Sequence, residues 1–194
     1  MNMKAVAVYL GSAPACKDIY KGLAYELGCR IARTGLTLVY GGAAVGTMGA
    51  LADGAAAEGG RVVGVFPRGF LGTKEVRDSG LEVVQHGLSE FIETADFAER
   101  KQVMEDLSDG CIVMPGSFGT LDELFTYACN RAIDKHMKPI LVFNFEGYYD
   151  PLKQLLANMQ EAGFMKPFMA SAITFCDTIE EIVEAIRAAG SESV

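Results

Sequence analysis

A glycine-rich turn at residues 115–120 contains the groups best suited to holding an anion. It reads Pro115-Gly116-Ser117-Phe118-Gly119-Thr120 and lies between an apolar run and a predicted helix. Its glycines let the backbone approach a ligand closely, and the free N–H groups and dipole of the helix favour a phosphate, with the Thr120 hydroxyl as a further donor. The structural alternative is a tight turn in which Thr120 caps the helix. The turn lacks the Gly-Lys-Ser/Thr of a P-loop, so triphosphate chemistry with magnesium is not indicated.

Glu123 lies one turn after Thr120 and is the carboxylate in this region best placed to do chemistry. If it points into a cleft, it can act as a general acid or base or stabilise positive charge. The alternative is that Asp122 and Glu123 only complement the dipole at the start of a helix.

Two basic residues, Arg100 and Lys101, fall within a helix that we predict from about Leu88 to Asp109. The apolar stripe of that helix would comprise Leu88, Phe91, Ile92, Ala95, Val103 and Leu107. Lys101 falls nearly opposite the stripe, which predicts an exposed side chain. Arg100 flanks the stripe, which would allow it to be partly buried and held for an anion.

A second glycine-rich turn runs from Tyr40 to Gly49 and also connects a predicted strand to a helix. It suits close approach by a ligand or by another loop, and a packing role for its glycines is nearly as well supported. It is not the dinucleotide fingerprint G-x-G-x-x-G, and the next strand ends in Pro67-Arg68 where an acidic ribose ligand would be expected. Redox use of NAD is therefore disfavoured.

Short apolar runs that alternate with helical spacing position these turns. We predict strands at 4–10, 36–40, 61–66, 111–114, 139–143 and 172–175, with a further short strand at 81–84 after a surface loop at 68–80. We predict helices at 18–33, 48–58, 88–109, 120–135, 151–161 and 179–189. The pattern is typical of an α/β, Rossmann-like, doubly wound and mostly parallel sheet flanked by helices. Residues 1–194 should form a single nucleotide-binding domain, with the last few residues disordered.

Composition excludes several classes of protein. The 194 residues carry 17 Lys+Arg and 25 Asp+Glu, a net charge of −8, which argues against binding to long nucleic acids. Half of the residues are apolar and 22% are charged, which fits neither a disordered chain nor a membrane protein. The 5 cysteines are scattered, as expected for reduced thiols of a cytoplasmic protein, and the 2 histidines are not at metal-ligand spacing, so we expect no metal site.

Taken together, these motifs resemble the LONELY GUY family, often labelled "lysine decarboxylase-like", over nearly the whole chain. The family signature P-G-G-x-G-T-x-x-E corresponds to Pro115–Glu123, and Glu99-Arg100-Lys101 precedes it at the family's spacing. Supporting matches are Gly11-Ser12, Gly41–Gly49, Gly64–Pro67, Lys138-Pro139 and Gly147-Tyr148-Tyr149. Departures are Ser117, Ala43, Ala98-Glu99 and Cys129-Asn130, which could remodel the base pocket.

The resemblance implies a homodimeric hydrolase that needs no cofactor. Such enzymes cleave the N-glycosidic bond of nucleoside 5′-monophosphates, such as AMP or a cytokinin riboside monophosphate, and release the base and ribose 5-phosphate. The decarboxylase label implies pyridoxal phosphate, for which the sequence shows no supporting arrangement. Glu123 would stabilise the oxocarbenium-like state or activate water, and Arg100 would bind phosphate or the leaving group. The backbone of Gly116, Ser117, Phe118, Gly119 and Thr120 would hold the phosphate, with Lys101, Ser12, Gly42 and Glu82 as further candidate contacts.

Two other hypotheses stay open from the sequence. The runner-up is a non-catalytic nucleotide- or cofactor-binding protein, like the molybdenum-cofactor carriers, which Ser117 and Ala43 favour. A purely structural or interaction protein would not need an Arg, a Glu and a glycine loop that converge.

Overall fold

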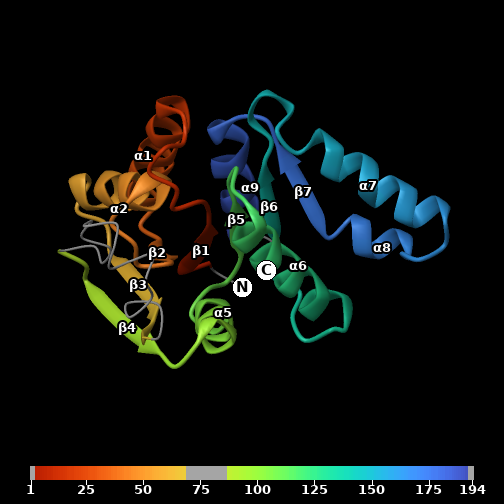
Figure 1. The fold of residues 1–194 in the computed structure, drawn as a ribbon, viewed down its shortest axis with the longest axis horizontal. Helices are drawn as coiled ribbons and strands as arrows, with labels where there is room; N and C mark the ends of the chain where they lie inside the picture. Colours follow the sequence, from red (N-terminus) through yellow and green to blue (C-terminus); the bar gives the residue numbers. More distant parts are fainter. Residues whose placement is uncertain (1–2, 69–86, 192–194) are drawn as a thin grey trace.

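A computed structural model describes residues 3–68 and 87–191 and shows one seven-stranded sheet in which all paired strands are parallel. The strands are β1 (Ala5–Tyr9), β2 (Thr37–Tyr40), β3 (Val62–Pro67), β4 (Glu90–Thr94), β5 (Cys111–Val113), β6 (Ile140–Phe143) and β7 (Ile173–Cys176). Their order is β4-β3-β2-β1-β5-β6-β7 (Figure 1). This is the predicted Rossmann-like α/β architecture. The short strand expected at 81–84, and the surface loop expected at 68–80 apart from its first residue, lie outside the described residues.

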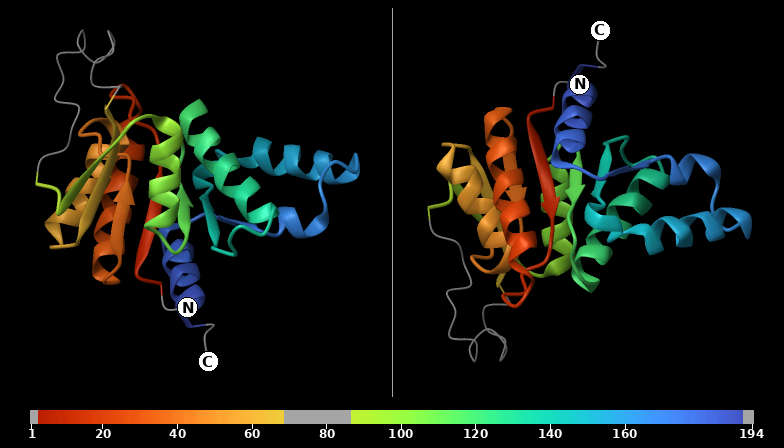
Figure 2. Two further views of the ribbon diagram at one scale, coloured as in Figure 1. Left: turned by 90° about the horizontal axis from the view of Figure 1, so that it is seen from below. Right: turned by 90° about the horizontal axis from the view of Figure 1, so that it is seen from above.

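Helices cover both faces of the sheet (Figure 2). They are α1 (Asp18–Arg33), α2 (Gly46–Ala57), α5 (Phe97–Asp106), α6 (Phe118–Ala132), α7 (Asp150–Glu161), the short α8 (Pro167–Ala170) and α9 (Ile179–Ser191), with a 3₁₀ turn at Phe145–Gly147. Apolar side chains of α1, α2 and α9 pack on one face, and those of α5, α6 and α7 pack on the other. The strands are buried between the two layers, which explains their continuous apolar runs.

The prediction of one helix over 88–109 is wrong. Residues Glu90–Thr94 form β4, an edge strand paired in register with β3, and α5 begins only at Phe97. The Asp96 side chain accepts a hydrogen bond from the Glu99 N–H at 2.9 Å, which starts the helix there. Because adjacent Phe91 and Ile92 fit a helical stripe as well as an edge strand, the apolar pattern did not separate the two.

The remaining element boundaries follow the sequence closely. The helix predicted at 18–33 has these bounds, and α6 begins at Phe118, two residues before its predicted start. None of the helices among residues 3–68 and 87–191 is long and apolar enough to cross a membrane. The expected disordered end, at 192–194, lies outside the described residues.

Candidate active site

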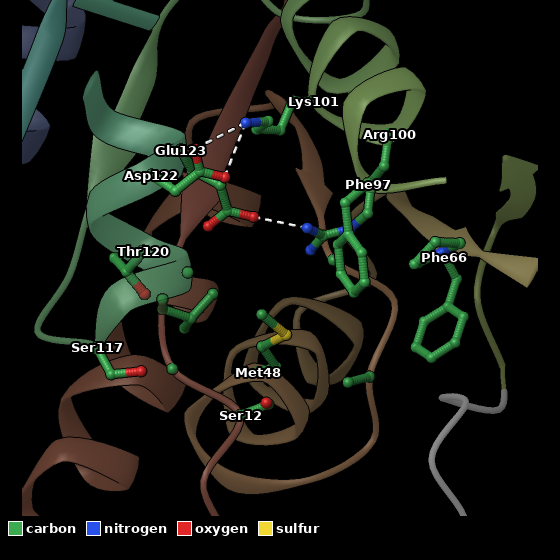
Figure 3. Close-up of a pocket in the computed structure, with 16 residues that line it drawn as sticks. Ser12, Met48, Phe66, Phe97, Arg100, Lys101, Ser117, Thr120, Asp122 and Glu123 are labelled. Atoms are coloured by element: carbon green, nitrogen blue, oxygen red, sulfur yellow. Dashed lines mark hydrogen bonds and ion pairs between the residues drawn. The ribbon is translucent and has the colours of Figure 1, made fainter. Parts of the chain in front are cut away.

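The candidate site lies at the point in the sheet where the order of the strands reverses. β1 and β5 are neighbours, and the chain continues from β1 toward β2 and β3 but from β5 toward β6 and β7. In such folds a crevice forms beyond the carboxyl ends of the two strands at this point. A cavity of about 160 Å³ occupies it, lined by Leu10, Gly11, Ser12, Gly41, Ala43, Met48, Phe66, Pro67, Phe97, Arg100, Lys101, Ser117, Gly119, Thr120, Asp122 and Glu123 (Figure 3).

A buried ion pair joins Arg100 of α5 to Glu123 of α6. Arg100 Nη1 lies 2.6 Å from Glu123 Oε1, and both residues are only 6% exposed. Arg100 Nε also donates to the carbonyl oxygen of Val65, near the end of β3, at 3.0 Å. The guanidinium is therefore fixed from two sides, and the anion that it meets in this structure is Glu123.

Burial raises the pKa of the Glu123 carboxyl above its ordinary value. The Arg100 guanidinium acts in the opposite direction through its charge and its hydrogen bond, and Asp122 adds a smaller upward effect. A carboxyl with a raised pKa next to a permanent cation can exchange protons nearer neutrality than an exposed glutamate. Glu123 thus has the environment of a catalytic acid or base.

Gly41, in the turn after β2, makes room for Arg100. A Cβ added at Gly41 would lie 2.1 Å from Arg100 Nη2, far inside van der Waals contact. The first glycine of the run at 41–49 therefore contributes to the site by leaving space for the guanidinium.

Lys101 is not the exposed side chain that the helical stripe predicted. Its ammonium lies 2.7 Å from Asp122 Oδ2 and 3.0 Å from Thr126 Oγ1, and its side chain is 19% exposed. The predicted stripe was wrong because four of its six residues, Leu88, Phe91, Ile92 and Ala95, precede α5. Lys101 lies on the side of α5 that packs beside α6. Lys101 and Asp122, which both line the cavity, therefore largely neutralise each other's charge.

The start of α6 forms the second wall of the cavity. Ser117 is the residue before the helix, and the N–H groups of the first turn lack acceptors within the helix itself. Thr120 is in the first turn and is not the cap. A Cβ at Gly116 would lie 2.1 Å from Thr120 Oγ1, so Gly116 accommodates the Thr120 side chain. This wall has the geometry of an anion site at a helix N-terminus.

The structure brings together most of the predicted site residues. Those that line the cavity are Ser12, Arg100, Lys101, Ser117, Gly119, Thr120 and Glu123. Gly42, Gly116 and Phe118 do not line it, and the Phe118 side chain is 90% exposed. Glu82 lies outside the described residues.

The sequence did not reveal the apolar wall of the cavity, which includes Met48, Phe66 and Phe97. Figure 3 shows Phe66 and Phe97 on the side opposite Ser117 and Thr120, with the Arg100–Glu123 pair between the two sides. Phe97 is half exposed, and the Arg100 guanidinium carbon lies 5.9 Å from its ring centre. The sequence signal for Phe97 was its position three residues before Arg100. Cys129 and Asn130 lie elsewhere: Asn130 donates to Glu105 at 2.6 Å.

Within residues 3–68 and 87–191, no group of three or more His, Cys, Asp or Glu side chains is arranged to hold a metal ion. The polar side chains that line the cavity are instead two carboxylates, two cations and three hydroxyls, from Asp122, Glu123, Arg100, Lys101, Ser12, Ser117 and Thr120. A helix start beside such cations and hydroxyls is suited to an anion.

Comparisons with known proteins identify the family of this chain. Residues 48–186 match the model of a family described as "Possible lysine decarboxylase". Proteins named cytokinin riboside 5′-monophosphate phosphoribohydrolase are similar over most of this chain. That of Rhodococcoides fascians is 38% identical over 184 residues, 95% of this chain and 89% of the relative. That of Mycobacterium tuberculosis is 38% identical over 180 residues, 93% and 91% of the two chains.

Solved structures share the fold. The molybdenum cofactor carrier protein of Chlamydomonas reinhardtii superposes with a TM-score of 0.69 at 19% identity, over 96% of this chain and 98% of that one. The molybdenum cofactor binding protein of Rippkaea orientalis superposes with a TM-score of 0.67 at 22% identity, over 95% and 96%. At these identities the likeness establishes the architecture alone.

Proposed function

This chain belongs to the family described as "Possible lysine decarboxylase", and we propose that it hydrolyses the N-glycosidic bond of nucleoside 5′-monophosphates. The curated relatives at 38% identity are named as phosphoribohydrolases of cytokinin riboside 5′-monophosphate. The observation that carries the proposal is the buried pair of Arg100 and Glu123, 2.6 Å apart, beside the start of α6. The products are the free base and ribose 5-phosphate.

The proposed reaction breaks the bond between C1′ of ribose and the nitrogen of the base. Water supplies the hydroxyl group at C1′ and a proton, and the base leaves with one proton in place of the ribose. Positive charge develops on the ribose ring in the transition state, and a nearby carboxylate stabilises it. Glu123 is assigned this role, or the removal of the proton from the attacking water. Arg100 stays protonated, so it orients Glu123 and hydrogen-bonds to the phosphate or the leaving base.

The two walls of the cavity suit the two ends of such a substrate. The helix start at Ser117, Gly119 and Thr120 would hold the 5′-phosphate. The apolar wall at Met48 and Phe66 would contact a planar base. The phosphate and the base would then lie on opposite sides of the Arg100–Glu123 pair, which places the glycosidic bond near Glu123.

The test is to incubate the protein with AMP or isopentenyladenosine monophosphate and to measure release of the free base by chromatography. Glu123→Ala should lose turnover while it still binds ribose 5-phosphate, and Glu184→Ala, which removes an exposed carboxylate of α9, should behave as the wild type. Absence of base release from every monophosphate in a panel would refute the proposal. Ligand binding that Glu123→Ala leaves intact, with no turnover in the wild type, would indicate the non-catalytic binding protein instead.

We also propose that the chain forms a homodimer through α5 and the end of α6. Large apolar side chains are exposed at the start of α5 and in the segments that follow α5 and α6, namely Phe97 at 50%, Leu107 at 42%, Ile133 at 74% and Met137 at 70%. Exposed apolar surface of this kind is typical of interfaces. Light scattering should give twice the mass of one chain at micromolar concentration, and a monomeric mass would contradict the proposal.

We further propose one domain over residues 1–194 and a cytoplasmic location. The five cysteines, at positions 16, 29, 111, 129 and 176, are free thiols, which suits a reducing compartment. A single cooperative unfolding transition and recovery of the protein in the cytoplasmic fraction would be the expected results.

A further inference from the structure

Two adjacent tyrosines reach from the turn after β6 to the strand end and glycine loop that precede α6. The Tyr149 hydroxyl donates to the Met114 carbonyl at 2.8 Å, and the Tyr148 hydroxyl donates to the Gly116 carbonyl, also at 2.8 Å. Neither tyrosine lines the cavity. They belong to the Gly147-Tyr148-Tyr149 run, whose role the proposed reaction leaves unexplained.

Packing contacts also hold the ring of Tyr148, independently of this hydrogen bond. It packs edge-on against Tyr149, with ring centres 5.0 Å apart, and against Tyr20 of α1, with ring centres 6.0 Å apart. The Tyr149 N–H donates to Asn144 Oδ1 at 2.7 Å, which anchors the backbone of the same turn. The Tyr148 hydroxyl therefore acts on Gly116 from a fixed position.

The hydrogen bond to the Gly116 carbonyl holds the peptide group that joins Gly116 to Ser117 in one orientation. In a planar trans peptide the carbonyl and the following N–H point in opposite directions. Since Tyr148 holds the Gly116 carbonyl on its own side, the Ser117 N–H is directed to the other side, and Ser117 lines the cavity. A reversed peptide would present a carbonyl oxygen to an anion and remove a donor from the site.

We propose that Tyr148 is a positioning residue that keeps the Gly116–Ser117 peptide oriented for phosphate. The inference rests on the proposed function, because it concerns the same phosphate site. Tyr148 acts only on the phosphate end of the substrate, so its loss should weaken phosphate binding and leave the chemical step intact.

The test is Tyr148→Phe, which removes one hydroxyl and keeps the packed ring. Loss of one hydrogen bond predicts a rise of about three- to ten-fold in the KM for AMP and in the inhibition constant of ribose 5-phosphate. The kcat and the inhibition constant of adenine, which has no phosphate, should stay within about two-fold of the wild type. Tyr25→Phe is the matched control, because Tyr25 lies on α1 and is 43% exposed against 42% for Tyr148.

A second readout does not depend on turnover. Titration with inorganic phosphate should shift the amide resonances of Ser117 and Gly119 in the wild type and in Tyr25→Phe, with weaker affinity in Tyr148→Phe. This result would support the inference even in a protein that hydrolyses no monophosphate, which separates it from failure of the proposed function. Unchanged phosphate affinity in Tyr148→Phe, a fall in kcat alone, or an equal loss of adenine binding would overturn it, as would phosphate that leaves both amides of the wild type unmoved.

Discussion

Replacing Gly41 with alanine should disable the site through a single steric contact with Arg100. The new Cβ would lie 2.1 Å from Arg100 Nη2, whereas real Cβ atoms essentially never come within 3.0 Å of a neighbour. The guanidinium must therefore retreat by about 1 Å, unless the backbone moves. The Met48 methyl and sulfur, at 3.0 and 3.1 Å, can adjust because that side chain is flexible.

The size of the effect follows from what holds Arg100. Its Nη1 is 2.6 Å from Glu123 and its Nε is 3.0 Å from the Val65 carbonyl, so a movement of about 1 Å breaks the ion pair or strains both bonds. Disrupting a buried ion pair costs about 3–5 kcal/mol when one partner is left alone, and partial relaxation should reduce this to about 2–4 kcal/mol of stability. A displacement of this size in an active site predicts a loss of about 100-fold in kcat/KM.

A double-mutant cycle tests whether the effect passes through Arg100. Base release from AMP would be measured for Gly41→Ala, Arg100→Lys and the double variant, with urea unfolding to follow stability. Lysine has no Nη2, so Gly41→Ala should add little to the loss already caused by Arg100→Lys. Gly28→Ala is the control for destabilisation remote from the cavity, because its Cβ would meet the α2 backbone. Activity of Gly41→Ala within two-fold of the wild type, or losses that multiply in the double variant, would refute the reasoning.

Two other predictions concern pH and packing. Glu123 acts as a carboxylate with a raised pKa, so kcat/KM should fall as the pH drops through that pKa. Because Asp122 raises this pKa and Lys101 lowers it, Asp122→Asn should move the acidic limb of the pH profile to lower pH and Lys101→Met should move it to higher pH. Shifts of both variants in the same direction would contradict the assignment. In α1, exposed Gly22 has nothing within 4 Å of an added Cβ, so Gly22→Ala should stabilise the protein by about 0.5–1 kcal/mol. A Cβ at Gly28 would lie 2.1 Å from the backbone oxygen of Leu51, so Gly28→Ala should destabilise the protein by more than about 1 kcal/mol. Urea unfolding would measure the stability of both variants.

The sequence was sufficient for the architecture because the central strands are buried on both faces. Runs such as Ala5–Tyr9 and Ile140–Phe143 are apolar throughout, and they alternate with amphipathic helices. The edge strand β4 was missed because it is mostly exposed and has no such run. The start of α5 was nevertheless marked by Asp96 and by Glu99 three residues later, a capping pattern that outweighs a few ambiguous apolar residues.

The motif spacing identified Arg100 and Glu123, but their partners depend on how distant elements meet. Val65 and Gly41 belong to β3 and to the turn after β2, and nothing in their local sequence indicates that they contact an arginine on α5. Phe66 and Met48 likewise have the residue types of a core. Only the strand order places them beside the carboxyl ends of β1 and β5, where they become a cavity wall.

The structure also changes the expected source of positive potential at the phosphate site. A chain with a net charge of −8 must attract an anion locally, and the sequence suggested Arg100 and Lys101 for this purpose. Both are already paired, with Glu123 and Asp122, so their net contribution at the start of α6 is small. The backbone N–H groups at the start of α6 have no acceptor within their own helix, so they are the donors left for an anion. The orientation of the Gly116–Ser117 peptide is therefore decisive for phosphate affinity.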